Sequence, residues 1–172
     1  AKFNGPVDIA FDSDNQMYVL DHDNTKIRKV VDNGTNRIVT DYAGNGNWGD
    51  RDGDALSAEL GGLQSIVIDS NDNIHIIYQQ ATNMNIKYAT RAISTDGSVK
   101  GLGTWTISTP VNLPEVGSYI SMDIAEDDSL YVAYFQGPPE GQDLLWSKKT
   151  PGGSWAHGVI DTAGNTGRYN SI

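Results

Sequence analysis

The chain has 172 residues, a formal net charge of −10 and no cysteine. The lack of cysteine excludes disulfides, thiolate zinc sites and a cysteine nucleophile, and the acidic balance argues against nucleic acid as a partner. No apolar run approaches the roughly 20 residues that a membrane-spanning helix requires, so we expect a chain that does not span a membrane.

Short apolar stretches broken by Gly, Asn, Asp and Ser predict many strands and few helices. Three segments resemble one another, each with an apolar strand, an acidic turn and a second apolar strand: 9–20 (IAFDSDNQMYVL), 66–77 (IVIDSNDNIHII) and 122–133 (MDIAEDDSLYVA). Each segment is typical of a β-hairpin. The corresponding turn positions are 57 residues apart from Asp12 to Asp69 and 56 apart from Asp69 to Ala125.

Two further strands are predicted after each hairpin. The third strands are expected at 25–31, 85–91 and 143–149, and the fourth at 37–42, 104–109 and 154–161. A repeat of this length with four strands per unit predicts a β-propeller, because each small sheet has two apolar faces that only neighbouring sheets can cover. The predicted units are blade one (1–60), blade two (61–116), blade three (117–166) and the first strand of a fourth blade (167–172).

Three blades are fewer than the four to eight of a closed propeller. The predicted fold is therefore an incomplete ring within a longer chain, or a ring that is completed when copies associate through their blade edges. A β-sandwich is the alternative, although it would not require similar successive units. The sequence begins at Ala1, which fits a mature form or an excised piece, and its cysteine-free composition favours an extracellular or cell-surface location.

Blade one resembles an NHL-type repeat, on residues 4–21 (NGPVDIAFDSDNQMYVLD) and 24–30 (NTKIRKV) and on the bridge at 43–46 and 53–60. Blades two and three resemble the sialidase-like, BNR-type repeats of bacterial surface proteins, on residues 73–78, 85–90, 152–155 and 159–172. These resemblances imply the propeller fold. For function they imply a protein or RNA platform, a lyase or hydrolase, or an extracellular module.

Tyr18, His75 and Tyr131 occupy the same position on the second strand of each unit. One interpretation makes His75 a general base or a metal ligand. The other places all three side chains in one slot between blades, where the polar tip binds a backbone group. Recurrence at one structural position favours the second interpretation. Trp105 and Trp155 are also equivalent, and we expect both to pack between blades.

The bridge after blade one contains the candidate binding residues. Asp50, Asp52 and Asp54 alternate around a glycine, as oxygen ligands of calcium do, but the glutamate that closes an EF-hand loop is missing. Trp48 lies among glycines and asparagines with no strand pattern, so its indole either stacks on a sugar or a partner, or holds the loop in place.

No pairing of a nucleophile with a base is legible, and the arginines do not form a sialidase-like cluster. The sequence therefore predicts a non-catalytic module, secreted or surface-attached, that uses its rim loops to bind protein or glycan. The alternatives are a fragment of a propeller hydrolase or lyase, and a structural subunit that self-associates through blade edges.

Overall fold

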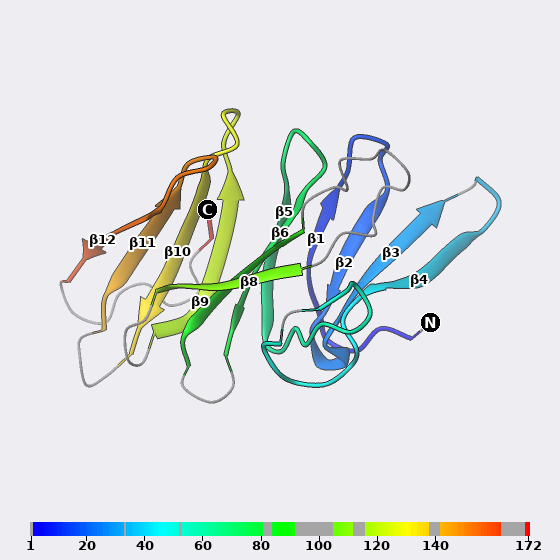
Figure 1. The fold of residues 1–172 in the computed structure, drawn as a ribbon, viewed down its shortest axis with the longest axis horizontal. Coiled ribbons are helices and arrows are strands. Elements are labelled where there is room, and N and C mark those ends of the chain that lie inside the picture. The colour runs from blue at the N-terminus through cyan, green and yellow to red at the C-terminus, as the bar shows by residue number, and fades with distance from the viewer. Residues whose placement is uncertain are drawn as a thin grey trace.

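In the computed structural model, the described residues form three four-stranded antiparallel sheets that stand side by side (Figure 1). The structure describes residues 2–32, 34–51, 53–80, 84–91, 105–111, 116–137, 142–162 and 171–172. Among them, no helix is long and apolar enough to cross a membrane. The all-β, repeated architecture predicted from the sequence is confirmed, and the three sheets do not close into a ring.

Chain order and spatial order agree within every sheet, so neighbouring strands are joined as successive hairpins. Sheet one contains β1 (Pro6–Phe11), β2 (Met17–Asp21), β3 (Lys26–Asp32) and β4 (Arg37–Ala43), with a 3-10 turn η1 (His22–Asn24) after β2. Sheet two contains β5 (Leu63–Ile68), β6 (Ile74–Gln79), β7 (Ile86–Arg91) and β8 (Trp105–Val111). Sheet three contains β9 (Val116–Ile124), β10 (Leu130–Gln136), β11 (Leu144–Lys149) and β12 (Trp155–Asp161).

The first hairpin of each sheet turns through a residue with a left-handed backbone. These residues are Asn15, Asp72 and Asp128, with φ of 57°, 62° and 58°, and Asn and Asp tolerate this conformation better than other side chains. In sheets one and two, Asp12 and Asp69 close the turn, because their Oδ1 atoms accept the backbone N–H groups two and four residues later.

Two hydrophobic cores fill the spaces between the sheets. Core one joins Leu20 of sheet one to Ile76 and Trp105 of sheet two, and core two joins Ile77 of sheet two to Val132 of sheet three. Ile76 and Ile77 are consecutive on β6 and both are fully buried, since side chains alternate between the two faces of a strand. Sheet two is thus covered on both faces.

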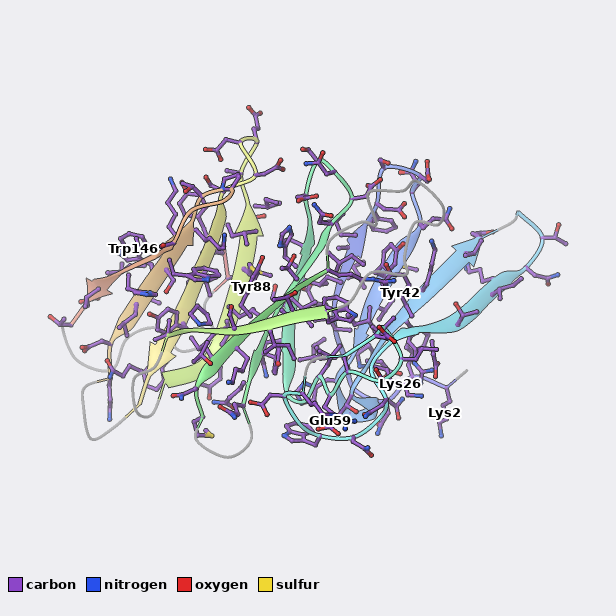
Figure 2. The ribbon with its side chains drawn as sticks, viewed as in Figure 1. Lys2, Lys26, Tyr42, Glu59, Tyr88 and Trp146 are labelled. Atoms are coloured by element: carbon purple, nitrogen blue, oxygen red, sulfur yellow. The ribbon has the colours of Figure 1, made fainter. Side chains whose placement is uncertain are left out.

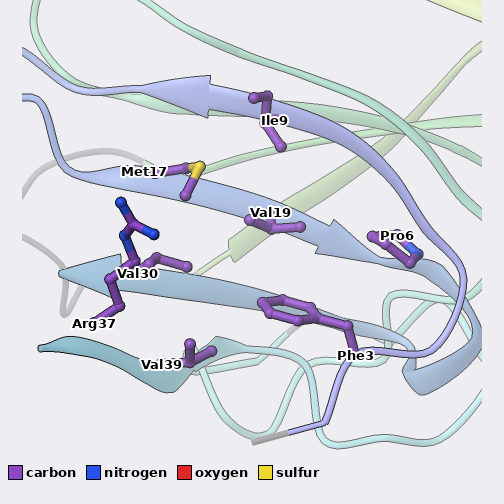
Figure 3. Close-up of a pocket in the computed structure, with 8 residues that line it drawn as sticks. All are labelled: Phe3, Pro6, Ile9, Met17, Val19, Val30, Arg37 and Val39. Carbon is purple, nitrogen blue, oxygen red and sulfur yellow. The ribbon is translucent and has the colours of Figure 1, made fainter. Parts of the chain in front are cut away.

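The outer sheets each have one open apolar face. On sheet one, Ile9 and Phe11 are 52% and 54% exposed. They belong to the head face, which holds a groove of about 370 Å³ (Figure 3) lined by Phe3, Pro6, Ile9, Met17, Val19, Val30, Arg37 and Val39. The opposite end of the array is the tail face of sheet three, where a groove of about 410 Å³ is lined by residues that include Tyr131, Trp146, Ile160 and Ile172.

Hydrogen bonds between equivalent positions connect the first strands of successive sheets. In this inner ladder, a side chain on one sheet accepts the backbone N–H of the next unit: Asp8 from Ile66 (2.9 Å), Ser65 from Met122 (3.3 Å), and Ser121 from Ile172 (3.2 Å). A second ladder joins the hairpin turns, where Ser13 donates to Asp72 and Ser70 to Asp128. Ile172 therefore continues the repeat at the place predicted for the first strand of a fourth unit, whose residues 167–170 lie outside the described residues.

Ser65 is the buried rung of the inner ladder, and its removal tests the ladder. Its hydroxyl donates to Asp8 Oδ2 (2.7 Å) and accepts from Met122 N. The Ser65→Ala substitution should lower the free energy of unfolding by about 1–2 kcal/mol, because a part-buried carboxylate oxygen and a buried N–H both lose a partner. Urea unfolding followed by tryptophan fluorescence measures this. Ser121→Ala, which removes the exposed last rung, is the control and should cost less; a Ser65→Ala variant as stable as the wild type would contradict the ladder.

Candidate functional site

The bridge between sheets one and two (residues 44–62) holds Trp48 in a fixed orientation. Its indole lies against two glycines, since a Cβ added at Gly61 would be 3.0 Å from Trp48 Cδ1 and one added at Gly62 would be 3.3 Å from Cζ2. The His22 ring packs against the indole in a T-shaped arrangement, with 5.7 Å between ring centroids. Trp48 nevertheless remains 49% exposed, so the indole holds the bridge in place and also presents a free surface.

The bridge is itself a hydrogen-bonded loop. Gly44 N donates to Ala55 O (2.8 Å), and Gly61 N donates to Gly49 O (2.9 Å), which draws the two ends of the bridge together. Gly53 pairs with the start of β8, because Trp105 N donates to Gly53 O (3.0 Å). The exposed aromatic surface is therefore attached to both adjoining sheets.

Further polar groups lie in the same bridge and on the segments next to it. The Asp50 carboxylate accepts from Gln80 Nε2 (2.5 Å) and lies 3.2 Å from Lys87 Nζ. His22 Nδ1 is 2.5 Å from Leu63 O and so donates to it. We call Trp48, His22, Asp50, Gln80 and Lys87 the rim site. Sequence reasoning singled out Trp48 and Asp50 and missed the other three, which no local motif connects to them.

A second cluster lies between sheets two and three. His75 Nδ1 is 2.6 Å from Tyr88 Oη, and His75 Nε2 is 3.2 Å from Asp69 Oδ2. Because a carboxylate only accepts, Nε2 carries the proton and Tyr88 donates to Nδ1. The three side chains line a cleft of about 350 Å³ together with residues that include Lys149 and Thr150. Figure 2 shows Tyr88 between the two sheets.

We compared the chain with known protein families, curated proteins and solved structures. No family model and no curated protein matches the chain. Among solved structures, a PQQ-bound aldose sugar dehydrogenase from Streptomyces coelicolor is similar with a TM-score of 0.54 and 16% identity, over 87% of this chain and 46% of its own. A streptogramin B lyase is similar with a TM-score of 0.49 and 12% identity, over 95% of this chain and 57% of its own.

Repeated four-stranded sheets and the likeness to the dehydrogenase decide the architecture. The chain is an incomplete β-propeller. It spans about half the length of the solved structures that it resembles. At such low identity the likeness shows the fold alone. Sheets one, two and three are the three blades, and the exact boundaries between blades stay a prediction.

In the propeller, the repeated position of Tyr18, His75 and Tyr131 is a slot beside the hairpin turn. Tyr18 Oη donates to Asp12 Oδ2 (3.0 Å), just as His75 binds Asp69. The expectation that the polar tip binds a backbone group is therefore wrong for these two residues, because a turn carboxylate six residues earlier accepts instead. In blade three, where position 125 is alanine, Tyr131 is 38% exposed and lies under Lys148 Nζ, 4.8 Å from the ring centroid.

The slot favours a structural role for His75, since both ring nitrogens are engaged. Trp105 and Trp155 also pack as expected. Trp105 is fully buried in core one, and Trp155 packs against core two with its ring 5.3 Å from that of Tyr88.

The three aspartates proposed as calcium ligands have different surroundings. Asp50 is paired with Lys87 and Gln80. The backbone oxygen of Asp54 accepts from Ser57 N and Ala58 N, which makes a tight turn. Asp52 lies outside the described residues, and among those described no group of three His, Asp or Glu side chains could hold a metal ion. Calcium binding by this segment stays a prediction.

Burial is the main influence on the titration of the second cluster. It lowers the pKa of His75 below the ordinary value of 6.5, although Asp69 opposes the shift, and it raises the pKa of Tyr88 to about 12. The folded chain thus holds His75 neutral in a range of pH where the unfolded chain would already have bound a proton.

This neutral histidine should make stability depend on pH. Between pH 7 and pH 5 the unfolded state takes up a proton that folded His75 resists, so the free energy of unfolding should fall as the pH falls. His75→Tyr is the matched variant, because tyrosine fills the same slot in blade one. Urea unfolding at both pH values should show a larger loss for the wild type than for His75→Tyr. Parallel losses would show that His75 does not contribute.

Proposed function

We propose that this chain is a non-catalytic binding segment of a larger propeller, with the rim site as its working surface. The observation that supports this most directly is the Trp48 indole, which is fixed against Gly61 and Gly62 and is still half exposed. An aromatic surface that is rigid before binding loses little conformational entropy on binding.

The polar groups of the rim site favour a carbohydrate as the ligand. Asp50, in the same bridge as Trp48, brings an acceptor group together with the Gln80 amide and the Lys87 cation. A sugar ring presents an apolar face that stacks on an aromatic ring and hydroxyls that pair with such groups. We propose a glycan as the first partner class and a protein surface as the alternative.

We further propose an extracellular or cell-surface location, with NHL-type character in blade one and BNR-type character in blades two and three. The support is in the sequence: the NGPVDIAFDSDNQMYVLD segment of blade one, and the repeated tryptophans and absence of cysteine. A secreted module that binds glycans fits these features.

Binding to a glycan array, followed by calorimetry on any positive sugar, tests the proposed function. Trp48→Ala should weaken the affinity by about tenfold, since one aromatic stacking contact contributes about 1 kcal/mol or more. Leu56→Ala is the matched control, because Leu56 is 59% exposed on the same bridge, and it should bind like the wild type. If no glycan binds, the carbohydrate proposal is wrong. If Trp48→Ala binds a sugar as tightly as the wild type, the binding site does not include Trp48.

A structural, self-associating subunit is the second candidate, and the head face favours it. Ile9 lines a groove that a second sheet would cover (Figure 3), and Phe11 on the same strand is also exposed. Light scattering should then show a dimer or polymer, and Ile9→Glu should return it to a monomer because a buried charge opposes the contact. Leu56→Glu, placed away from this face, is the control. A monomeric wild type would end this candidate.

A fragment of a propeller hydrolase or lyase remains the third candidate. The two similar solved structures are described as a dehydrogenase and a lyase, but their likeness extends to the fold only. Catalytic groups would have to converge from blades beyond the three described here.

A further inference from the structure

Arg91, the last residue of β7, is a buried cation without a counter-ion in the described part of the chain. It is 3% exposed, and its side chain faces blade one. Its Nε, Nη1 and Nη2 atoms are all buried, and none of them has a hydrogen-bond partner among the described residues. The guanidinium carbon lies 4.6 Å from the centroid of the Tyr42 ring, which Figure 2 labels on blade one.

The Tyr42 ring does not satisfy the guanidinium. The ring attracts the guanidinium charge, but none of the guanidinium nitrogens has a hydrogen-bond partner among the described residues, the Tyr42 hydroxyl included. Arginine stays protonated in proteins, so it cannot escape the cost of burial by losing its proton. Its N–H groups therefore need an acceptor.

Arg28 shows how this chain stabilises a buried arginine when it provides the counter-ion. It is 8% exposed, its Nε lies 2.8 Å from Asp21 Oδ2, and its Nη1 contacts the carboxylate of Asp41. Asp21 is fully buried as well. Blade one thus pairs its buried arginine with two carboxylates, whereas the described residues around Arg91 provide none.

A second unpartnered donor lies beside Arg91. Trp105 is directly opposite it on β8, and opposite residues on paired strands place their side chains on the same face. Trp105 is fully buried, and its Nε1 also has no hydrogen-bond partner among the described residues. The nearby Asp12 carboxylate accepts from Tyr18 and from the backbone of its own turn. Unsatisfied donors and a positive charge therefore meet between blades one and two.

We propose that a small inorganic anion of the chloride class binds between blades one and two, on the N–H groups of Arg91 and Trp105. The anion neutralises the guanidinium and accepts both sets of donors, while the Tyr42 ring adds its own attraction for the positive charge. It stabilises the contact between the two blades. This inference is independent of the glycan proposal, because the rim site shares none of these three residues.

Thermal unfolding of the full chain in sodium chloride and in sodium gluconate, at equal ionic strength, tests the proposal. Equal ionic strength keeps general screening constant, and gluconate is too large for a buried site. Saturating chloride should raise the Tm of the wild type by about 2–4 °C over gluconate, the shift typical of a modest ligand on a chain of this size. In Arg91→Met the difference should vanish.

Two matched variants test whether the chloride effect belongs to this site. Arg37→Met removes an arginine whose side chain is 76% exposed and should keep the full chloride effect. Asp96→Asn alters an acidic residue of segment 92–104, which lies outside the described residues, and should also keep it. An equal Tm in both salts for the wild type, or a chloride effect that first appears in Asp96→Asn, would overturn the proposal.

A crystallographic measurement covers the case in which Arg91→Met does not fold. Crystals of the wild type grown with sodium bromide should show an anomalous peak within hydrogen-bond distance of the Arg91 guanidinium. Bromide peaks elsewhere with none beside Arg91 would overturn the proposal.

Discussion

A four-stranded sheet with two apolar faces is stable only when other sheets cover both of them, and this constraint organises the whole chain. Blade two satisfies it, since Ile76 and Ile77 point to opposite sides and both are fully buried. Blades one and three satisfy it on one side only. The head face around Ile9 and the tail face around Tyr131 are therefore left open among the described residues.

Repeated hydrogen bonds between neighbouring sheets set the register of this packing. Apolar faces alone tolerate sliding, because burial is not directional. The inner ladder through Asp8, Ser65 and Ser121 fixes the position of each first strand along the next one. The second ladder fixes the hairpin turns of neighbouring sheets relative to one another. With the scaffold held in this way, the bridge can carry a half-exposed Trp48 without disturbing the cores.

Equivalent positions of the repeat also differ in their surroundings. The slot of Tyr18 and His75 has a carboxylate acceptor in the hairpin turn, whereas Tyr131 has Ala125 at that place and lies under Lys148. Buried arginines differ in the same way. Arg28 meets two carboxylates of its own blade, while Arg91 crosses to the Tyr42 ring of another blade and leaves its N–H groups for a ligand.

The sequence by itself determined the strands, their hairpin order and the repeat, because alternation of apolar residues and turn chemistry are local properties. It also singled out Trp48 and Asp50 as candidate binding residues. Only the tertiary structure brought His22, Gln80 and Lys87 to the rim site, turned the Asp12 and Asp69 carboxylates toward Tyr18 and His75, and left Arg91 beside Tyr42. The physical reason is that the rim site and the Arg91–Tyr42 contact join residues from different blades. The hydrogen bonds of Tyr18 to Asp12 and of His75 to Asp69 depend on how each hairpin turn folds back on its own strand. No local pattern of residues encodes the distance between such groups.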